Sequence, residues 1–167
     1  MNEDYIQDLC KILNKQYNIY KKLAELASEK EKTLLNNDAQ KLSEIIKKEK
    51  THLEDLEKYE DKRKDIIEQI AQKQSFDYDN LSFENLLSTL NNNQKNKLKT
   101  IRDKLLDIIK KLEEKNDTNR HLLEQALKLN NFSLKMFQQA MQPEQKTYNR
   151  PGEKNDDNGR NIIDRKA

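Results

Sequence analysis

The sequence predicts an elongated all-α protein. Every glycine and proline among its 167 residues lies after residue 142, which argues against the tight turns of β folds. Hydrophobic residues make up only 34% and aromatic residues 6%, a composition that favours long helices burying one stripe each over a thick globular core. We expect an antiparallel helical hairpin or coiled coil plus a third long helix, together a three-helix bundle over residues 1–142, then a flexible tail over residues 143–167.

The first helix is predicted over residues 3–35. Its apolar residues recur at steps of three or four, as in an amphipathic helix. Adjacent apolar pairs such as Ile12/Leu13 and Ile19/Tyr20 widen the stripe, so this helix should contact two neighbours. Cys10, the single cysteine, lies on the stripe and is expected to be buried or half-buried, without a role as a nucleophile.

The second helix is predicted over residues 38–73, with Asn37 as its N-cap and Gln40 completing a capping-box pattern. A heptad seam runs along it, because five residues lie seven apart: Leu42, Glu49, Leu56, Arg63 and Ile70. Glu49 and Arg63 should lay their stems along the seam and keep their charges in water. The first two helices would each be roughly 50 Å long, and their short connection predicts an antiparallel hairpin.

Residues 74–96 are predicted to leave the long helices. The polar stretch from Gln74 reads as a loop, and a short helix follows over residues 82–91. Ser82 is its expected N-cap, with Leu81 and Leu86 placed as a hydrophobic staple. We expect the leucines of this excursion to close one end of the bundle.

The third long helix is predicted over residues 94–141, before Pro143. Its apolar period is interrupted at residues 115–119, where the sequence allows either a buried asparagine that fixes register or a bend. If this helix runs back along the hairpin, its last ten or so residues should extend past the turn at residues 36–38. The result would be a projecting C-terminal helix.

The C-terminal half of this helix carries more apolar surface than one packing partner needs. At about 100° per residue, five side chains fall within about 40° of one line: Leu123, Leu127, Leu134, Phe137 and Met141. Leu122, Ala126, Leu129 and Met136 form an adjoining row, with Phe132 at its far edge. We call these ten residues the C-terminal strip. Such a strip indicates a binding site or an assembly interface. The alternatives are that it belongs to the core, or that the helix folds back at residues 115–119 and buries it.

Several functional classes are disfavoured. The 32 basic and 30 acidic residues make a mixed surface without a nucleic-acid footprint. No apolar run is long enough to span a bilayer, and no secretory signal is recognised. His52 and His121 lack neighbours at metal-ligand spacing, and residues 1–142 hold no Gly-rich phosphate loop. We therefore expect a cytoplasmic protein that is not an enzyme and takes no cofactor, metal or small-molecule ligand.

Three stretches of the sequence resemble elements of one protein family and follow one another in the same order. Glu49–Arg63 ("EKTHLEDLEKYEDKR"), Asn119–Phe137 ("NRHLLEQALKLNNFSLKMF") and Tyr148–Gly152 ("YNRPG") are similar to the corresponding elements of FlgN-type flagellar export chaperones. In the first stretch Glu49, His52 and Tyr59 depart from the family pattern, whereas Leu53, Leu56, Glu60 and Arg63 match it. The second stretch carries the family's N-x-x-L-L-x-x-x-L pattern.

The resemblance implies a cytosolic, non-catalytic chaperone of type III flagellar export. Such chaperones bind terminal helical segments of hook–filament junction (hook-associated) proteins, prevent premature assembly and aid delivery to the export apparatus. Their C-terminal amphipathic helix binds cargo, which carries over to Leu122, Leu123 and Leu127. The angular argument adds Leu134, Met136, Phe137 and Met141, and the resemblance implies that Tyr148 contacts the export machinery. The alternative is a structural coiled-coil protein whose strip mediates homo-oligomerisation.

Overall fold

The computed structural model describes residues 3–74 and 82–141 and gives four helices there, with no strand in those ranges. They are α1 (Glu3–Leu35), α2 (Ala39–Gln74), α3 (Phe83–Ser88) and α4 (Asn92–Met141). The all-α prediction is confirmed, and the three long helices begin and end within about two residues of their predicted bounds. The predicted tail and Leu81, one half of the expected staple, lie outside the described residues.

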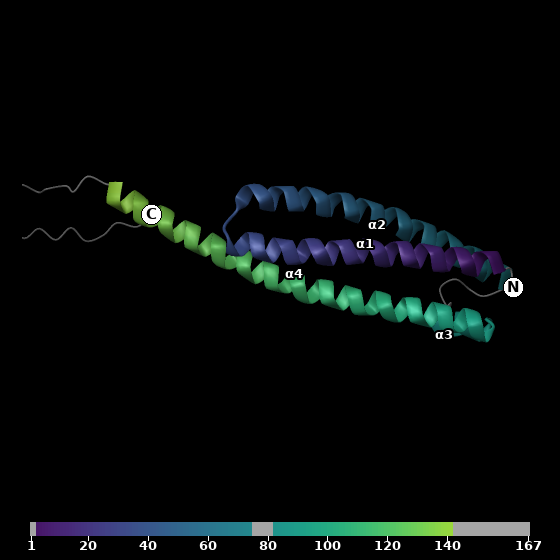
Figure 1. Cartoon of the computed structure of the whole chain (residues 1–167). Helices are drawn as coiled ribbons and strands as arrows, with labels where there is room; N and C mark the ends of the chain where they lie inside the picture. The colour runs from purple at the N-terminus through teal and green to yellow at the C-terminus, as the bar shows by residue number, and fades with distance from the viewer. Residues whose placement is uncertain (1–2, 75–81, 142–167) are drawn as a thin grey trace, which may run out of the picture. The chain divides into compact units, whose positions relative to one another are not determined.

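Helices α1 and α2 lie side by side as an antiparallel hairpin (Figure 1). Gln16 Nε2 donates to Glu60 Oε2 over 3.0 Å, and Lys30 Nζ meets Glu49 Oε2 at 2.5 Å. Later residues of α1 therefore face earlier residues of α2. Ile45 and Ile70 of the predicted heptad region are buried. Glu49 lies half-buried and paired, so its charge is met by Lys30 as well as by water.

The turn between α1 and α2 corrects the predicted cap. Asn37 has φ 54° and ends α1, because its N–H bonds the Leu34 carbonyl while the Asp38 N–H bonds the Thr33 carbonyl. This paired pattern closes a helix through one left-handed residue, a conformation that asparagine tolerates. Asp38 is the N-cap of α2 instead, since its Oδ1 accepts from the Lys41 N–H at 2.9 Å. The assignment of Asn37 as the cap was wrong by one residue.

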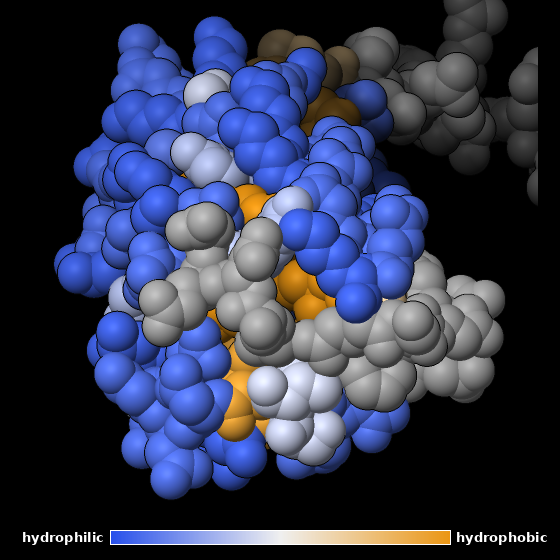
Figure 2. Space-filling model, turned by 90° about the vertical axis from the view of Figure 1, so that its right-hand side faces the viewer, coloured by the Kyte–Doolittle hydropathy of each residue, from blue (hydrophilic) through white to orange (hydrophobic). Residues whose placement is uncertain are grey.

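One hydrophobic cluster contains residues of all four helices and lies at the end of the hairpin where α1 begins. Its buried members are Ile6, Leu9, Ile70, Leu86, Leu87, Leu90 and Leu98. Ser82 caps α3 as predicted, by accepting from the Asn85 N–H. Helix α3 ends at Ser88, three residues before its predicted end. It and the turn after it bury Leu86, Leu87 and Leu90, three of the leucines that were expected to close this end. Figure 2 shows hydrophobic surface gathered in the middle of this end, with hydrophilic residues around it.

Cys10 packs against this cluster and is half-buried, as expected. Burial raises the pKa of its thiol, which the nearby Lys97 charge partly offsets. A raised pKa keeps the sulfur protonated at neutral pH and lowers its reactivity. The residue is therefore part of the packing between helices.

Helix α4 runs unbroken through residues 115–119, so the alternative in which it folds back there was wrong. Asn119 is only 5% exposed, and its Nδ2 donates to the Ala27 carbonyl of α1 over 2.8 Å. Lys115 forms an ion pair with Glu31 of α1 at 2.6 Å. Asn119 therefore has the register-fixing role that was one of the two expectations for this stretch.

The direction of α4 follows from these contacts. Leu98, near its start, packs with Ile6 and Leu9, whereas Asn119 reaches Ala27. Helix α4 therefore runs parallel to α1 and antiparallel to α2, as Figure 1 shows. By compactness the chain divides into two units, residues 1–131 and residues 132–167, and the last ten residues of α4 belong to the second.

The cap assignment predicts that Asp38→Ala lowers the free energy of unfolding by about 1 kcal/mol, because the Lys41 N–H loses its acceptor. Asp38→Asn should keep most of that stability, since the amide oxygen still accepts. Urea unfolding followed by circular dichroism measures both. If Asp38→Ala matched the wild type, Asp38 would not be the cap.

The contacts of Glu60 with Gln16 and Arg63 predict that the stability of the fold depends on pH. The hydrogen bond from Arg63 lowers the pKa of Glu60, against some opposing burial, and Gln16 adds to the lowering. A carboxyl with a lowered folded-state pKa stabilises the fold above its unfolded value of about 4.3. This contribution is lost as the pH falls through the lower, folded-state pKa. For so accessible a pair we expect less than about 1 kcal/mol.

The measurement compares wild type with Glu60→Gln by urea unfolding at pH 6 and at pH 3. The wild type should lose more stability on acidification than the variant, because only the wild type has a carboxylate to protonate at position 60. Equal losses in the two proteins would show that Glu60 does not carry the effect.

Candidate partner-binding surface

The predicted strip lies on the surface of α4. Its exposed large side chains range from 43% to 68% exposed and are Leu123, Leu127, Leu129, Phe132, Leu134, Met136, Phe137 and Met141. Leu122 and Ala126 are half-buried. The alternative that the strip forms core is therefore wrong for these eight residues. Tyr148, the remaining predicted site residue, lies outside the described residues.

The same segment of α4 also has a polar face. Its exposed residues alternate in sequence with the apolar ones and include Glu124, Lys128, Asn131 and Lys135. The segment is therefore amphipathic with its apolar half facing solvent. This is the arrangement of a helix that completes its packing on another molecule. Met136 and Met141 suit such a surface, because unbranched thioether side chains repack against different partners.

A second apolar surface lies between the helices of the first unit, and the sequence reasoning missed it. This α2–α4 groove of about 420 Å³ is lined by Leu23, Lys30, Leu34, Leu42, Ile46, Glu49, Leu53, Leu112, Asn116, Asn119, Arg120 and Leu123. Ile46 and Leu53 are 51% and 54% exposed. The available signal was the adjacent pairing in the heptad seam: Ile45 is buried, and the next residue, Ile46, faces the groove.

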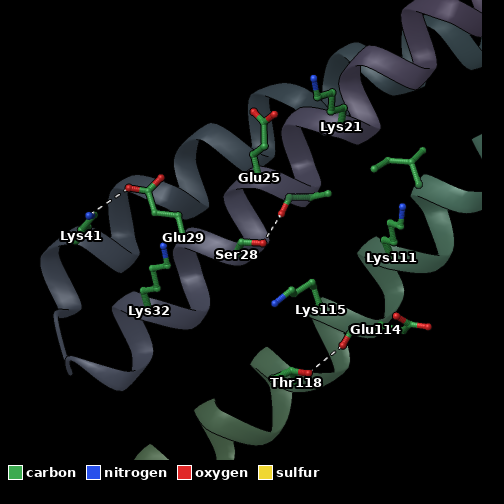
Figure 3. A pocket seen from close by; sticks show the side chains of 12 residues that line it. Lys21, Glu25, Ser28, Glu29, Lys32, Lys41, Lys111, Glu114, Lys115 and Thr118 are labelled. Carbon is green, nitrogen blue, oxygen red and sulfur yellow. Dashed lines mark hydrogen bonds and ion pairs between the residues drawn. The ribbon is translucent and has the colours of Figure 1, made fainter.

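A larger hollow of about 880 Å³ has a different character (Figure 3). Its labelled lining is mostly lysine and glutamate from α1, α2 and α4. Lys41 meets Glu29 at 3.2 Å, and the hydroxyls of Ser28 and Thr118 donate to carbonyls of their own helices. These are interactions of solvated helix faces, so we assign this hollow no ligand.

The titratable groups form no catalytic arrangement in the part of the chain that the structure describes. Burial first, and then the charge of Glu60, raise the pKa of Tyr20, which lies beside the Gln16–Glu60 contact. His52 is half-buried on α2 and His121 is exposed on α4. Residues 3–74 and 82–141 contain no cluster of three histidine, cysteine or acidic side chains suited to a metal ion. None of the described helices is long and apolar enough to cross a membrane.

Comparison with known proteins identifies the family. The family model of FlgN, described as FlgN protein, matches residues 1–156. No curated protein and no solved structure matches the chain. The match covers all four helices, including the exposed strip on α4. FlgN proteins are chaperones of flagellar type III export that bind export substrates. The chain belongs to the FlgN family.

Proposed function

We propose that this protein is a cytoplasmic, non-catalytic export chaperone for hook–filament junction proteins. It binds their terminal helical segments through the C-terminal strip, prevents premature assembly and aids delivery to the export apparatus. The observation that carries the proposal is the strip itself. In a member of a chaperone family, six residues singled out by sequence are exposed on one helix: Leu123, Leu127, Leu134, Met136, Phe137 and Met141.

The physical chemistry suits a temporary partner. A cargo segment that assembles by helix packing is masked when a second apolar helix face covers the same side chains. Because the contact is apolar and non-covalent, it comes apart without a chemical step when the cargo is handed over. The strip lies on one continuous helix that a cargo helix can pack along. We also propose that Tyr148 contacts the export machinery, an assignment supported by the family resemblance alone.

A second candidate function rests on the same exposed residues. The strip would serve homo-oligomerisation in a structural coiled-coil protein, because exposed apolar helix faces also pair with copies of themselves. Sedimentation at micromolar concentration separates the two. A monomer favours the chaperone, and a tight dimer that Phe137→Asp dissolves favours the structural protein.

The proposed function predicts that Phe137→Asp or Leu127→Asp abolishes cargo binding. Each change places a carboxylate where a cargo helix would bury it, and an unpaired buried charge is strongly unfavourable. Both side chains are exposed, so helicity and unfolding should stay near wild type. Calorimetric titration with each purified hook–filament junction protein of the same bacterium measures the loss.

Asn131→Asp is the matched control, since this exposed residue lies on the polar face of the same segment. It should bind cargo like the wild type. Full binding by Phe137→Asp and Leu127→Asp would rule out the strip as the site. Unfolding of either variant would place these side chains in the core.

Truncation gives an independent test. A chain ending at Asn131 keeps the first compact unit, including the Asn119–Ala27 hydrogen bond, and should unfold within a few degrees of the full protein. It lacks five exposed residues of the strip, so cargo affinity should fall by at least about tenfold. An earlier cut, after Thr118, would also remove Asn119 and confuse stability with binding. Unchanged affinity of the 1–131 chain would contradict the proposed site.

A further inference from the structure

The α2–α4 groove has the geometry of a helix-binding slot. Its walls carry two rows with the same spacing of i, i+4, i+7 and i+11: Leu42, Ile46, Glu49 and Leu53 on α2, and Leu112, Asn116, Asn119 and Leu123 on α4. Helix α1 forms the floor through Leu23, Lys30 and Leu34. Each row covers three helical turns, or about 17 Å. The spacing is that of bundle seams that face another helix.

The groove is layered. Helix α2 packs antiparallel to α1, and α4 packs parallel to it. These contacts show which residues of the three helices lie at the same level along the groove. Leu34, Leu42 and Leu123 form an apolar layer near the turn, and Leu23, Leu53 and Leu112 form another further down. The lining between them, which we call the polar layer, is mostly polar or charged and consists of Lys30, Ile46, Glu49, Asn116, Asn119 and Arg120. An occupant that matches all the layers has only one favourable register.

The apolar walls remain accessible. Ile46, Leu53 and Leu123 are each about half exposed, although they face the same groove. Leaving such side chains in water costs free energy that a docked apolar face would recover. Leu123 also begins the main line of the C-terminal strip, and Leu127 follows one turn later on α4. Leu123 is therefore shared by the groove and the C-terminal strip.

The polar layer specifies the chemistry of the occupant. Lys30 and Glu49 are half-buried and neutralise one another at 2.5 Å, so a charged residue opposite them would lack a partner. Asn119 donates to Ala27, but its Oδ1 is buried without a hydrogen-bond partner in the described chain. That oxygen is closed off from the groove, whereas Asn116 is exposed and lines it. The group that matches this amide is an uncharged polar side chain such as serine, threonine, asparagine or glutamine.

We propose that the α2–α4 groove holds one amphipathic helix of the exported cargo, which completes a four-helix bundle with α1, α2 and α4. The cargo helix presents apolar residues to the two leucine layers and an uncharged polar side chain to Asn116. This inference rests on the proposed function and adds to it a second docking surface, within residues 1–131, with a defined partner chemistry.

The test uses the full-length chain carrying Ile46→Asp and Leu53→Asp together. The two carboxylates would face the docked cargo helix, so the dissociation constant for the junction protein that wild type binds should rise at least about tenfold. Thr51→Asp is the matched control, because Thr51 is exposed on the opposite face of α2 and should leave affinity within about twofold. Calorimetry measures affinity, and circular dichroism checks that the variants fold.

A second measurement does not depend on the folding of the double variant. A photo-crosslinking residue placed at Leu53 in the otherwise wild-type chain should form an adduct with cargo, and the same residue at Thr51 should not. Wild-type affinity in the double variant, or no adduct at Leu53, overturns the groove proposal. So does a self-adduct at Leu53, which would assign the groove to a second copy.

The outcomes separate the two levels of inference. If wild type binds no junction protein, the proposed function fails. If wild type binds and Phe137→Asp does not, while the Ile46→Asp/Leu53→Asp protein binds normally, only the groove proposal fails.

Discussion

The hydrogen bond from Asn119 to the Ala27 carbonyl is the contact on which the arrangement of α4 depends. Apolar packing near the start of α4 would tolerate several rotations of a long helix, because leucine contacts are not directional. A buried amide tolerates far fewer, since a missed partner costs about 1–3 kcal/mol. The Lys115–Glu31 ion pair, whose lysine lies one turn earlier on α4, is a second polar contact between the same two helices. In this chain, the sequence pattern of Asn119, Leu122 and Leu123 thus begins with a residue that contacts the neighbouring helix.

The same face of α4 is buried at one end and exposed at the other. Asn119 contacts α1, whereas Leu123 and Leu127, one and two turns later on that face, are exposed. On α2, the adjacent residues Ile45 and Ile46 differ in their surroundings, since Ile45 is buried and Ile46 is exposed in the groove. The apolar residues of one helix therefore have two uses. One part forms the core with neighbouring helices, and the other forms surface that a further helix can cover.

The polar residues within the seams favour specificity over maximal stability. Gln16 with Glu60 and Lys30 with Glu49 place polar contacts between the two helices of the hairpin, where leucine pairs would pack as well. Each pair joins one position on α1 to one position on α2, which disfavours a shift of one helix along the other by a heptad. A long hairpin that carries a binding surface benefits from this restriction, because a shifted register would misalign the rows of the groove.

The sequence alone determined the all-α class, the bounds of the three long helices within about two residues, the Ser82 cap, and eight exposed residues among the ten of the C-terminal strip. Periodicity and the absence of glycine and proline before residue 143 are local properties, so they can be read without a fold. The tertiary structure decided the rest. It moved the cap of α2 from Asn37 to Asp38, because one residue had to take the left-handed conformation that ends α1. It also showed that Asn119 is buried and that α4 does not fold back, and it revealed the groove between α2 and α4. These features depend on contacts between residues far apart in the chain, which periodicity does not report.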